Sequence, residues 1–313
     1  MSIEKFIARR ASVINYELVL RVKRIPACRP RLREAMLYSL AAGGKRLRPV
    51  LLTASYELFG GDWREVLPAA CAIEMVHTYS LIHDDLPEMD DDDMRRGRPT
   101  NHMVFGEAMA LLAGDALLTN AFSVLYENSG IKGIRAERVL EAAGILARRA
   151  GAGGMASGQA ADLEAEGFLN SGARTRKYAG AQRARAARLL DYIHQHKTSD
   201  LIMASVEMGA ALAGAGAADF KILSDFAGAI GLCFQITDDI LDVVGDKKKL
   251  GKSGSDVRNA KLTYASLYGV RPSKAKAAAL IALARIKLAA LPCPPARVKV
   301  LADIAGFVYR REK

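Results

Sequence analysis

The sequence changes from apolar to acidic within the stretch Leu81-Ile82-His83-Asp84-Asp85-Leu86-Pro87-Glu88-Met89-Asp90. Residues 67–83, which lead into it, repeat apolar side chains at spacings of three and four, as one face of an α-helix does. Asp84 and Asp90 would diverge by roughly 240° on an ideal helix. Pro87 interrupts helical hydrogen bonding and permits a bulge or short loop, so the two carboxylates can still converge. A helix that ends in converging carboxylates is the first indication of both fold and chemistry.

The same helical spacing runs through most of the chain. It recurs in residues 32–40, 105–126, 137–148, 199–214, 220–244, 273–290 and 297–311. Glycine and proline breakers fall between these stretches, at residues 43–44, 60–61, 99, 151–154, 272 and 292–295. Strand-like alternation is short and rare. The pattern predicts an all-α protein of about ten or more helices. No linker is long enough to separate two domains, so we expect residues 1–313 to form a single all-helical domain.

Composition gives a sizeable core and a basic surface. Half of the residues are hydrophobic, 25 % are charged, and the formal net charge is +11. The basic residues are scattered except between residues 167 and 190, where six of them occur without an acid: Arg174, Arg176, Lys177, Arg183, Arg185 and Arg188. This stretch is either a solvated helix face or a docking surface for something anionic. A nucleic-acid site would interleave aromatic side chains with the cations, and Tyr178 is the only one between Arg174 and Arg188, so we expect no nucleic-acid partner.

Cysteine usage and the amino terminus indicate a cytoplasmic protein. The four cysteines are far apart and form no CxxC pair, which is typical of reduced thiols. Residues 1–5 lack an apolar signal region. No window approaches the roughly 18 uninterrupted apolar residues of a membrane span.

A second acidic segment, Phe234-Gln235-Ile236-Thr237-Asp238-Asp239-Ile240-Leu241-Asp242, lies about 150 residues after the first. Asp238 and Asp242 are one helical turn apart on the same face, whereas Asp239 lies about 100° around and is a less certain ligand. Apolar neighbours predict a largely buried helix, where unpaired carboxylates are costly. A hard cation with oxygen ligands neutralises such a cluster, and Mg²⁺ fits best when a substrate phosphate supplies further oxygens.

Cationic residues accompany the acids. Arg95 and Arg96 follow the first acidic run at once and suit bidentate phosphate contacts. Gly43-Gly44-Lys45-Arg46-Leu47-Arg48-Pro49 lacks P-loop spacing, but its glycine pair allows close backbone approach and its three cations suit a diphosphate. His77 lies two helical turns before Asp84. Metal ligands beside phosphate ligands predict chemistry on a diphosphorylated substrate.

The two acidic segments and the cationic residues, together with three further segments, resemble those of the trans-polyprenyl diphosphate synthases. The resemblance is nearest to the bacterial type of farnesyl diphosphate synthase. The further segments are Gly158-Gln159 with Asp162, His196-Lys197-Thr198 and Leu250-Gly251-Lys252. The ordered match spans about residues 30 to 311. The resemblance implies the all-helical isoprenoid synthase fold, usually a homodimer, with a central cavity between the two acidic segments.

The resemblance also implies a role for each matching residue. Asp84, Asp90 and Asp238 resemble Mg²⁺ ligands, with Asp85 and Asp242 in support. Lys45, Arg48, His77 and Arg96 resemble the isopentenyl diphosphate site. Arg95, Lys197 and Lys252 would hold the allylic diphosphate, and Thr198 and Gln235 would line the site of the carbocation. Among these, Asp84, Asp85, Arg95, Lys197, Thr198, Gln235, Asp238 and Lys252 would carry the catalysis.

The implied reaction condenses isopentenyl diphosphate with dimethylallyl and then geranyl diphosphate, using about three Mg²⁺ ions that stabilise the departing diphosphate. The growing tail would run along the helix that carries Asp84. Tyr79 lies five residues before Asp84 and is bulky, whereas Ser80 lies four before it and is small. Tyr79 is therefore expected to stop the tail at fifteen carbons, in farnesyl diphosphate. Geranylgeranyl or geranyl diphosphate is the alternative product.

Two other functions compete. A non-catalytic regulatory subunit would be expected to lose aspartates or the paired arginines, and this chain keeps both. A terpene cyclase shares the fold but has no use for Lys45, Arg48 and His77. The sequence departs from the family in its basic stretch at 172–188, and it lacks the usual proline after Thr263-Tyr264.

Overall fold

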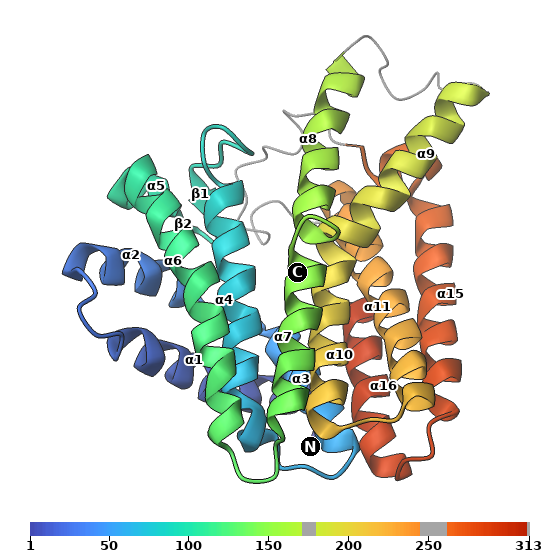
Figure 1. Cartoon of the computed structure of the whole chain (residues 1–313). Coiled ribbons are helices and arrows are strands. Elements are labelled where there is room, and N and C mark those ends of the chain that lie inside the picture. Colours follow the sequence, from blue (N-terminus) through green and yellow to red (C-terminus); the bar gives the residue numbers. More distant parts are fainter. Residues whose placement is uncertain (171–179, 245–261, 312–313) are drawn as a thin grey trace. The chain divides into compact units, whose positions relative to one another are not determined.

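Helices form nearly all of the regular structure in the computed structural model, which describes residues 1–170, 180–244 and 262–311 (Figure 1). The all-α prediction is confirmed. The described residues group into two compact units. The first comprises Met1–Ile145 and Ser205–Gly216, and the second comprises residues 146–170, 180–204, 217–244 and 262–311. The expectation of a single domain stays a prediction. Lys252 and three of the six cations in the basic stretch, Arg174, Arg176 and Lys177, lie outside the described residues.

The first unit is built around α4. Its helices are α1 (Ile3–Lys23), α2 (Pro30–Leu40), α3 (Leu47–Leu58), α4 (Leu67–Asp84), α5 (Asn101–Phe105) and α6 (Glu107–Tyr126), with the short helical turns η1 (Trp63–Val66) and η2 (Glu127–Gly130). Helix α4 is apolar almost all round and lies beside α6 (Figure 1). Gly114 on α6 makes this packing possible, because a Cβ there would lie 2.1 Å from His83 Nε2. The α4 helix is therefore held rigidly up to its acidic end.

Helix α4 ends where the sequence predicts. Its last residue is Asp84, and the chain then folds back so that the Asp90 amide donates to the Asp84 carbonyl over 2.9 Å. The loop expected from Pro87 is confirmed. A small antiparallel hairpin follows, in which β1 (Met94–Arg95) pairs with β2 (Arg98–Pro99). Its turn residues Arg96 and Gly97 have φ values of 53° and 73°, which is the left-handed conformation that tight hairpins require. The hairpin thereby returns Arg95 toward the end of α4.

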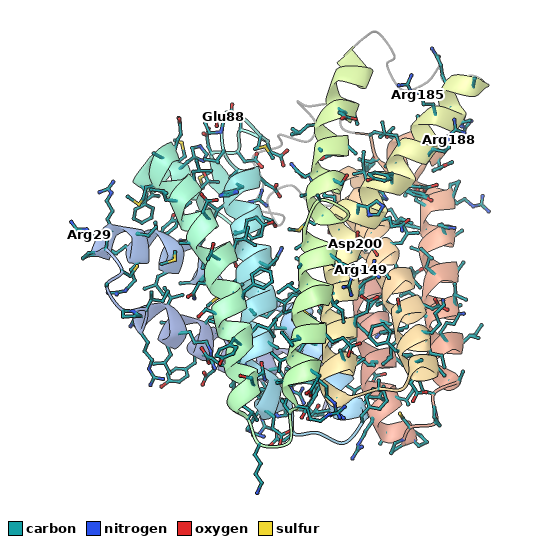
Figure 2. All side chains as sticks on the ribbon, viewed as in Figure 1. Arg29, Glu88, Arg149, Arg185, Arg188 and Asp200 are labelled. Atoms are coloured by element: carbon teal, nitrogen blue, oxygen red, sulfur yellow. The ribbon has the colours of Figure 1, made fainter. Side chains whose placement is uncertain are left out.

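The second unit surrounds α11. Its elements are α8 (Met155–Asn170), α9 (Ala181–Ile193), the π-helix η3 (His194–Ser199), α11 (Ala217–Val244), α14 (Tyr264–Tyr268), α15 (Val270–Ala289) and α16 (Pro295–Arg310). Helices α7 (Ala136–Ala150) and α10 (Asp200–Ala213) belong in part to each unit. Helix α11 packs along α15 and against η3. In Figure 2 Arg149 and Asp200 point toward one another, and their side chains form an ion pair of 2.6 Å.

One helical stretch of the described residues, Glu107–Gly130, is long and apolar enough to cross a membrane by length and composition alone. Asp115, Thr119 and Asn120 interrupt its apolar residues, so it is not the run of uninterrupted apolar residues that the sequence analysis found absent. Interior helices of globular proteins meet the same criteria, and residues along one face of α6, among them Ala113 and Leu117, are fully buried in this unit. The composition of α6 therefore gives no clear membrane span.

Candidate active site

The first acidic segment and its arginines meet at the carboxyl end of α4, which we call the α4 site. Arg95 Nε donates to Asp85 Oδ1 over 2.6 Å, and Arg95 Nη2 lies 3.6 Å from Asp92 Oδ2. Asp85 is buried, and its removal from water raises the pKa of its carboxyl to about 6, although the Arg95 guanidinium opposes that rise. Asp84 and Asp90 are partly buried beside it. The hairpin thus supplies the counter-charge that the carboxylates need.

A cluster of basic side chains forms the other part of the α4 site. Arg48 Nη1 lies 3.2 Å from His77 Nε2, and Arg96 Nη1 donates to the Gly43 carbonyl. Gly44, with φ of 125°, lies flat against the Arg96 guanidinium, since a Cβ there would be 2.9 Å from Arg96 Nη1. The predicted close backbone approach at the glycine pair is thus to an arginine side chain. Two guanidinium groups in such a cluster suit a dianionic phosphate.

Arg46 and Lys45, which belong to the glycine-containing segment 43–49, have different surroundings in the structure. Arg46 is 3 % exposed and turns into the core, where its guanidinium pairs with Glu74 over 2.6 Å and with Asn15 over 2.7 Å. Its φ of 49° places it in the left-handed region directly before α3. Lys45, next to it, remains partly exposed. The buried Arg46–Glu74 pair therefore anchors the loop from which Lys45 and Arg48 extend.

His77 is held neutral, and this predicts a pH dependence. Removal from water, reinforced by Arg48, Arg96, Arg46 and Arg95, lowers the pKa of His77 well below its usual value. Below about pH 6.5 the unfolded chain takes up a proton at this position and the folded chain does not, so the free energy of unfolding falls as the pH drops. We expect His77→Asn to reduce this loss between pH 7.5 and 5.

Urea titrations at several pH values measure this effect. The raised pKa of Asp85 acts in the opposite sense, because the folded chain binds its proton at a higher pH than the unfolded chain. Wild type and His77→Asn share that contribution, so the difference between their slopes isolates His77. Parallel stability curves for the two proteins would contradict the assignment of a neutral, acid-sensitive His77.

The residues expected to set product length lie on α4 itself. Tyr79 is partly buried, and its ring contacts His83 edge to face, with 5.6 Å between centroids and an interplanar angle of 77°. Burial, and then the Asp84 charge, raise the pKa of the Tyr79 hydroxyl. Ser80 Oγ donates to the His77 carbonyl over 3.0 Å. Tyr79 therefore lies close to Asp84, and its role in setting product length stays a prediction.

The second acidic segment lies on α11 and forms what we call the α11 site, together with η3. Asp238 is partly exposed and pairs with Arg311, whose Nη2 is 2.7 Å from Asp238 Oδ1 and whose guanidinium covers the Phe234 ring at 3.6 Å. Asp242 is also partly buried on the exposed side of the helix. Asp239 is 3 % exposed and faces the interior of this unit. The helical phase thus separates the acids as the sequence predicts.

The π-helix carries the other predicted residues of this site. Lys197 Nζ donates to Asp162 Oδ2 over 2.6 Å, and Thr198 Oγ1 donates to Gln235 Oε1 over 2.7 Å. Glycines on both sides make room for the wider π turn. A Cβ on Gly158 would lie 2.0 Å from the Lys197 backbone nitrogen, and one on Gly231 would lie 2.1 Å from Ser199 Oγ. π turns of this kind occur frequently at functional sites.

Several contacts in the α11 site were not assigned from the sequence. Arg311 and His194 had no recognisable signal, and the helical phase of Asp239 did not reveal what it contacts, because the partners of these residues are distant in the chain. Asp162 had one, since it lies three residues after Gln159 in the quoted motif. His196 Nδ1 lies 2.7 Å from Asp200 Oδ2, so this histidine supports the turn. Both polar atoms of the Gln159 amide are buried, and neither has a hydrogen-bond partner among the described residues.

The carboxylates suit Mg²⁺ as a partial ligand set. Among the described residues, no three His, Cys, Asp or Glu side chains already form a metal-binding group. Instead, Arg95 neutralises Asp85 and Arg311 neutralises Asp238. Mg²⁺ usually takes one or two protein carboxylates and completes its shell with water and substrate phosphates. Oxygen ligands held next to arginine side chains therefore fit an ion that arrives with a diphosphate.

The basic stretch is visible in part. Arg183, Arg185 and Arg188 are exposed on α9, and Figure 2 shows Arg185 and Arg188 on that helix. Arg183 donates to the Leu267 carbonyl over 3.4 Å, and Ala186 on the same helix is buried. These three cations lie on a solvated helix face, and its docking role stays a prediction.

Comparisons with known proteins agree with this geometry. Residues 29–289 match the family model described as polyprenyl synthetase. The chain is 46 % identical to the farnesyl diphosphate synthase of Geobacillus stearothermophilus over 283 residues, covering 89 % of this chain and 88 % of the relative. It is 43 % identical to the heterodimeric geranylgeranyl pyrophosphate synthase large subunit 1 of Arabidopsis thaliana, covering 98 % and 79 %. A Helicobacter pylori geranyltransferase, solved with magnesium and isoprenyl diphosphate, superimposes with a TM-score of 0.79 at 31 % identity, covering 99 % of both chains.

Proposed function

The chain belongs to the polyprenyl synthetase family and has its all-α isoprenoid synthase fold, and from that premise we propose that it is a magnesium-dependent farnesyl diphosphate synthase. It condenses isopentenyl diphosphate with dimethylallyl diphosphate and then with geranyl diphosphate. One observation carries the proposal. At the end of α4, the cluster of Arg48, His77 and Arg96 lies beside carboxylates whose counter-charge is Arg95. A diphosphate site next to a metal-binding acidic segment is what this reaction requires.

The residues of the chain perform the binding and orientation. Arg48 and Arg96, with Lys45 and neutral His77, hold the diphosphate of isopentenyl diphosphate. Mg²⁺ bound at Asp84, Asp90 and Asp238, with Asp85 and Asp242 in support, would neutralise the charge that develops on the leaving diphosphate. That Asp84 and Asp238 serve one substrate rests on the family resemblance. The Helicobacter pylori relative, solved with magnesium, supports the choice of ion.

The α11 site stabilises the positive charge on the substrate carbon. Lys197 is held by Asp162 and contributes a cation toward the allylic diphosphate, together with Lys252. Thr198 and Gln235 present oxygen atoms beside the carbocation. The double bond of isopentenyl diphosphate attacks that carbon, and the new carbocation then loses a proton to the released diphosphate, which gives the product. Preorganised dipoles of this kind lower the barrier because they need no reorganisation during the reaction.

The test of this function is direct. Purified protein is incubated with isopentenyl diphosphate and each allylic diphosphate in the presence of Mg²⁺, and the products are sized by chromatography. We expect mainly the fifteen-carbon product and no turnover in excess EDTA. A twenty-carbon main product would instead make the chain a geranylgeranyl diphosphate synthase. The Arabidopsis relative is named as a subunit of such a synthase. No product from any substrate would favour the non-catalytic regulatory subunit.

The outer face of α6 supports a homodimer as the working form. Leu111, Leu112, Phe122 and Tyr126 are exposed on this helix, Leu112 to 52 % and Tyr126 to 73 %. The opposite face of α6 is buried against α4, so the exposed apolar side chains are not part of the core. An apolar stripe on a helix is costly in water unless a partner covers it. We propose that a second copy of the chain covers this face.

Substitution in this stripe tests the dimer. We expect Leu112→Glu combined with Phe122→Glu to convert the protein to a monomer, because two carboxylates would have to be buried in the interface. Analytical ultracentrifugation measures the mass. Ile286→Glu is the matched control, since Ile286 is an exposed apolar residue on a different helix, α15. A wild-type monomer, or a dimer unaffected by the double substitution, would contradict this interface.

The cytoplasmic location expected from the sequence also remains a prediction. Cell fractionation with an antibody against the chain would test it.

A further inference from the structure

Asp239 differs from the acids beside it in what it contacts. Its side chain is 4 % exposed, and its carboxylate faces inward, away from the predicted metal ligand Asp238. Oδ2 accepts the backbone amide of Tyr264 over 2.7 Å and lies 3.2 Å from His194 Nε2. Oδ1 accepts from Gln235 Nε2 over 3.0 Å. Both oxygens are therefore engaged within the protein, and Asp239 is placed to hold other groups rather than an ion.

These contacts determine the orientation of the Gln235 amide. A carboxylate only accepts hydrogen bonds, so the end of Gln235 that faces Asp239 must be its NH₂ group. The carbonyl Oε1 then faces Thr198 and accepts the Thr198 hydroxyl proton over 2.7 Å. Thr198 has only one such proton. Once it is committed to Gln235, the remaining capacity of this hydroxyl consists of its oxygen lone pairs.

We propose that Asp239 is a positioning residue that, through Gln235, fixes the Thr198 hydroxyl as an acceptor toward the positive charge developing on the substrate carbon. The inference rests on the proposed prenyl transfer. A lone pair aimed at a carbocation stabilises it, whereas an O–H hydrogen aimed at it opposes it. In water the hydroxyl would rotate freely, and the relay Asp239–Gln235–Thr198 removes that freedom before the substrate ionises.

The anchoring of Asp239 supports this role. His194 belongs to the same π-helix as Thr198, and its ring stacks on Tyr264 with centroids 5.5 Å apart. The Tyr264 hydroxyl is in turn 3.2 Å from Asp191 Oδ1. Asp239 therefore ties α11 to both η3 and the start of α14. Because His194, Tyr264 and Gln235 all contact this carboxylate, its position is fixed. It can therefore determine the orientation of the Gln235 amide and the direction of the hydrogen bond between Thr198 and Gln235.

The first test is Asp239→Asn, which changes no heavy-atom geometry. The new amide can donate to Gln235, which then turns its carbonyl toward position 239 and its NH₂ group toward Thr198. The Thr198 proton is left to point at the substrate. We expect kcat to fall on the order of a hundredfold, as when one preorganised group is lost. The KM values and the Mg²⁺ concentration for half-maximal rate should change less than about threefold. Asp238→Asn, the matched control one residue away, should instead raise the Mg²⁺ requirement.

The decisive test is rescue by Asp239→Asn combined with Gln235→Glu. The amide introduced at position 239 then donates to the carboxylate introduced at position 235. The other oxygen of that carboxylate again accepts the Thr198 proton, so the original direction returns with the same net charge. We expect this double variant to exceed Asp239→Asn in kcat by about tenfold or more. It should also exceed Gln235→Glu alone, where two carboxylates face each other.

The outcomes distinguish a failure of the Asp239–Gln235–Thr198 relay from a failure of the proposed prenyl transfer. A folded Asp239→Asn with wild-type kcat, or a folded double variant no faster than the single variants, would overturn the relay while leaving prenyl transfer intact. If Asp239→Asn fails to fold, the comparison of the double variant with Gln235→Glu still decides. If the wild-type protein forms no prenyl product, the proposed function falls and the relay with it. Melting temperatures of all variants exclude unfolding as the cause.

Discussion

Asp84→Ala is expected to lower kcat by about a thousandfold or more, which corresponds to about 4 kcal/mol of lost transition-state stabilisation. The Asp84 carboxylate lies at the last position of α4, where the backbone is held by the return of Asp90 to the Asp84 carbonyl. Substitution removes the side chain but keeps that backbone bond. Because like-charged carboxylates repel each other without metal, the stability of the fold should be unchanged or slightly higher.

Steady-state kinetics over a range of Mg²⁺ concentrations, with thermal unfolding alongside, measure this prediction. Asp93→Ala is the matched control, because Asp93 is an exposed acid in the same run and is not expected to bind metal. Asp238→Ala should behave like Asp84→Ala, although it also releases Arg311. Turnover near the wild-type rate in Asp84→Ala, with Mg²⁺ present, would remove the metal role from the α4 site.

Local pattern was sufficient to predict eight helical stretches and the end of α4, whereas α1, α3 and α8 lie outside the predicted stretches. The apolar spacing before Asp84 and the break at Pro87 are properties of neighbouring residues, and the structure has both. Helical phase also separated Asp238 from Asp239, which lie about 100° apart on one helix. Helical phase could not identify the residues that Asp238 and Asp239 contact. Arg311, which covers Asp238, and Tyr264, which fixes Asp239, come close only after α14 and α16 have packed on α11.

The π-helix shows a second limit of local pattern. The sequence gives no sign of a π turn at residues 194–199, because the residues on either side keep the ordinary helical period. The signal lies in two glycines, Gly158 and Gly231, that are distant in the chain and leave space for the displaced backbone. The positions of Lys197 and Thr198 therefore depend on how η3 packs against α8 and against α11. The motif alone does not determine the orientation of these two side chains.

Tyr79→Ala is expected to shift the main product from fifteen carbons to twenty or longer. Tyr79 lies on α4 before Asp84 and close enough for the Asp84 charge to raise the pKa of its hydroxyl. Its ring rests against His83, and His83 is itself held by α6, since its Nε2 is 3.1 Å from the Leu111 carbonyl and Gly114 lies against its ring. The Tyr79 ring thus packs against a histidine that α6 holds in place, and it cannot easily move aside for a growing tail.

Removing the ring opens space for about one further isoprene unit, because a phenol side chain and a five-carbon unit have similar volumes. Ser80→Phe should act in the opposite direction and stop the tail at ten carbons, since it places an aromatic ring one position nearer to Asp84. Product sizing with dimethylallyl diphosphate as the allylic substrate measures both shifts, and Tyr79→Phe is the control that keeps the ring. A Tyr79→Ala variant that still stops at fifteen carbons would show that Tyr79 is a packing residue of α4 and that the floor of the pocket lies elsewhere.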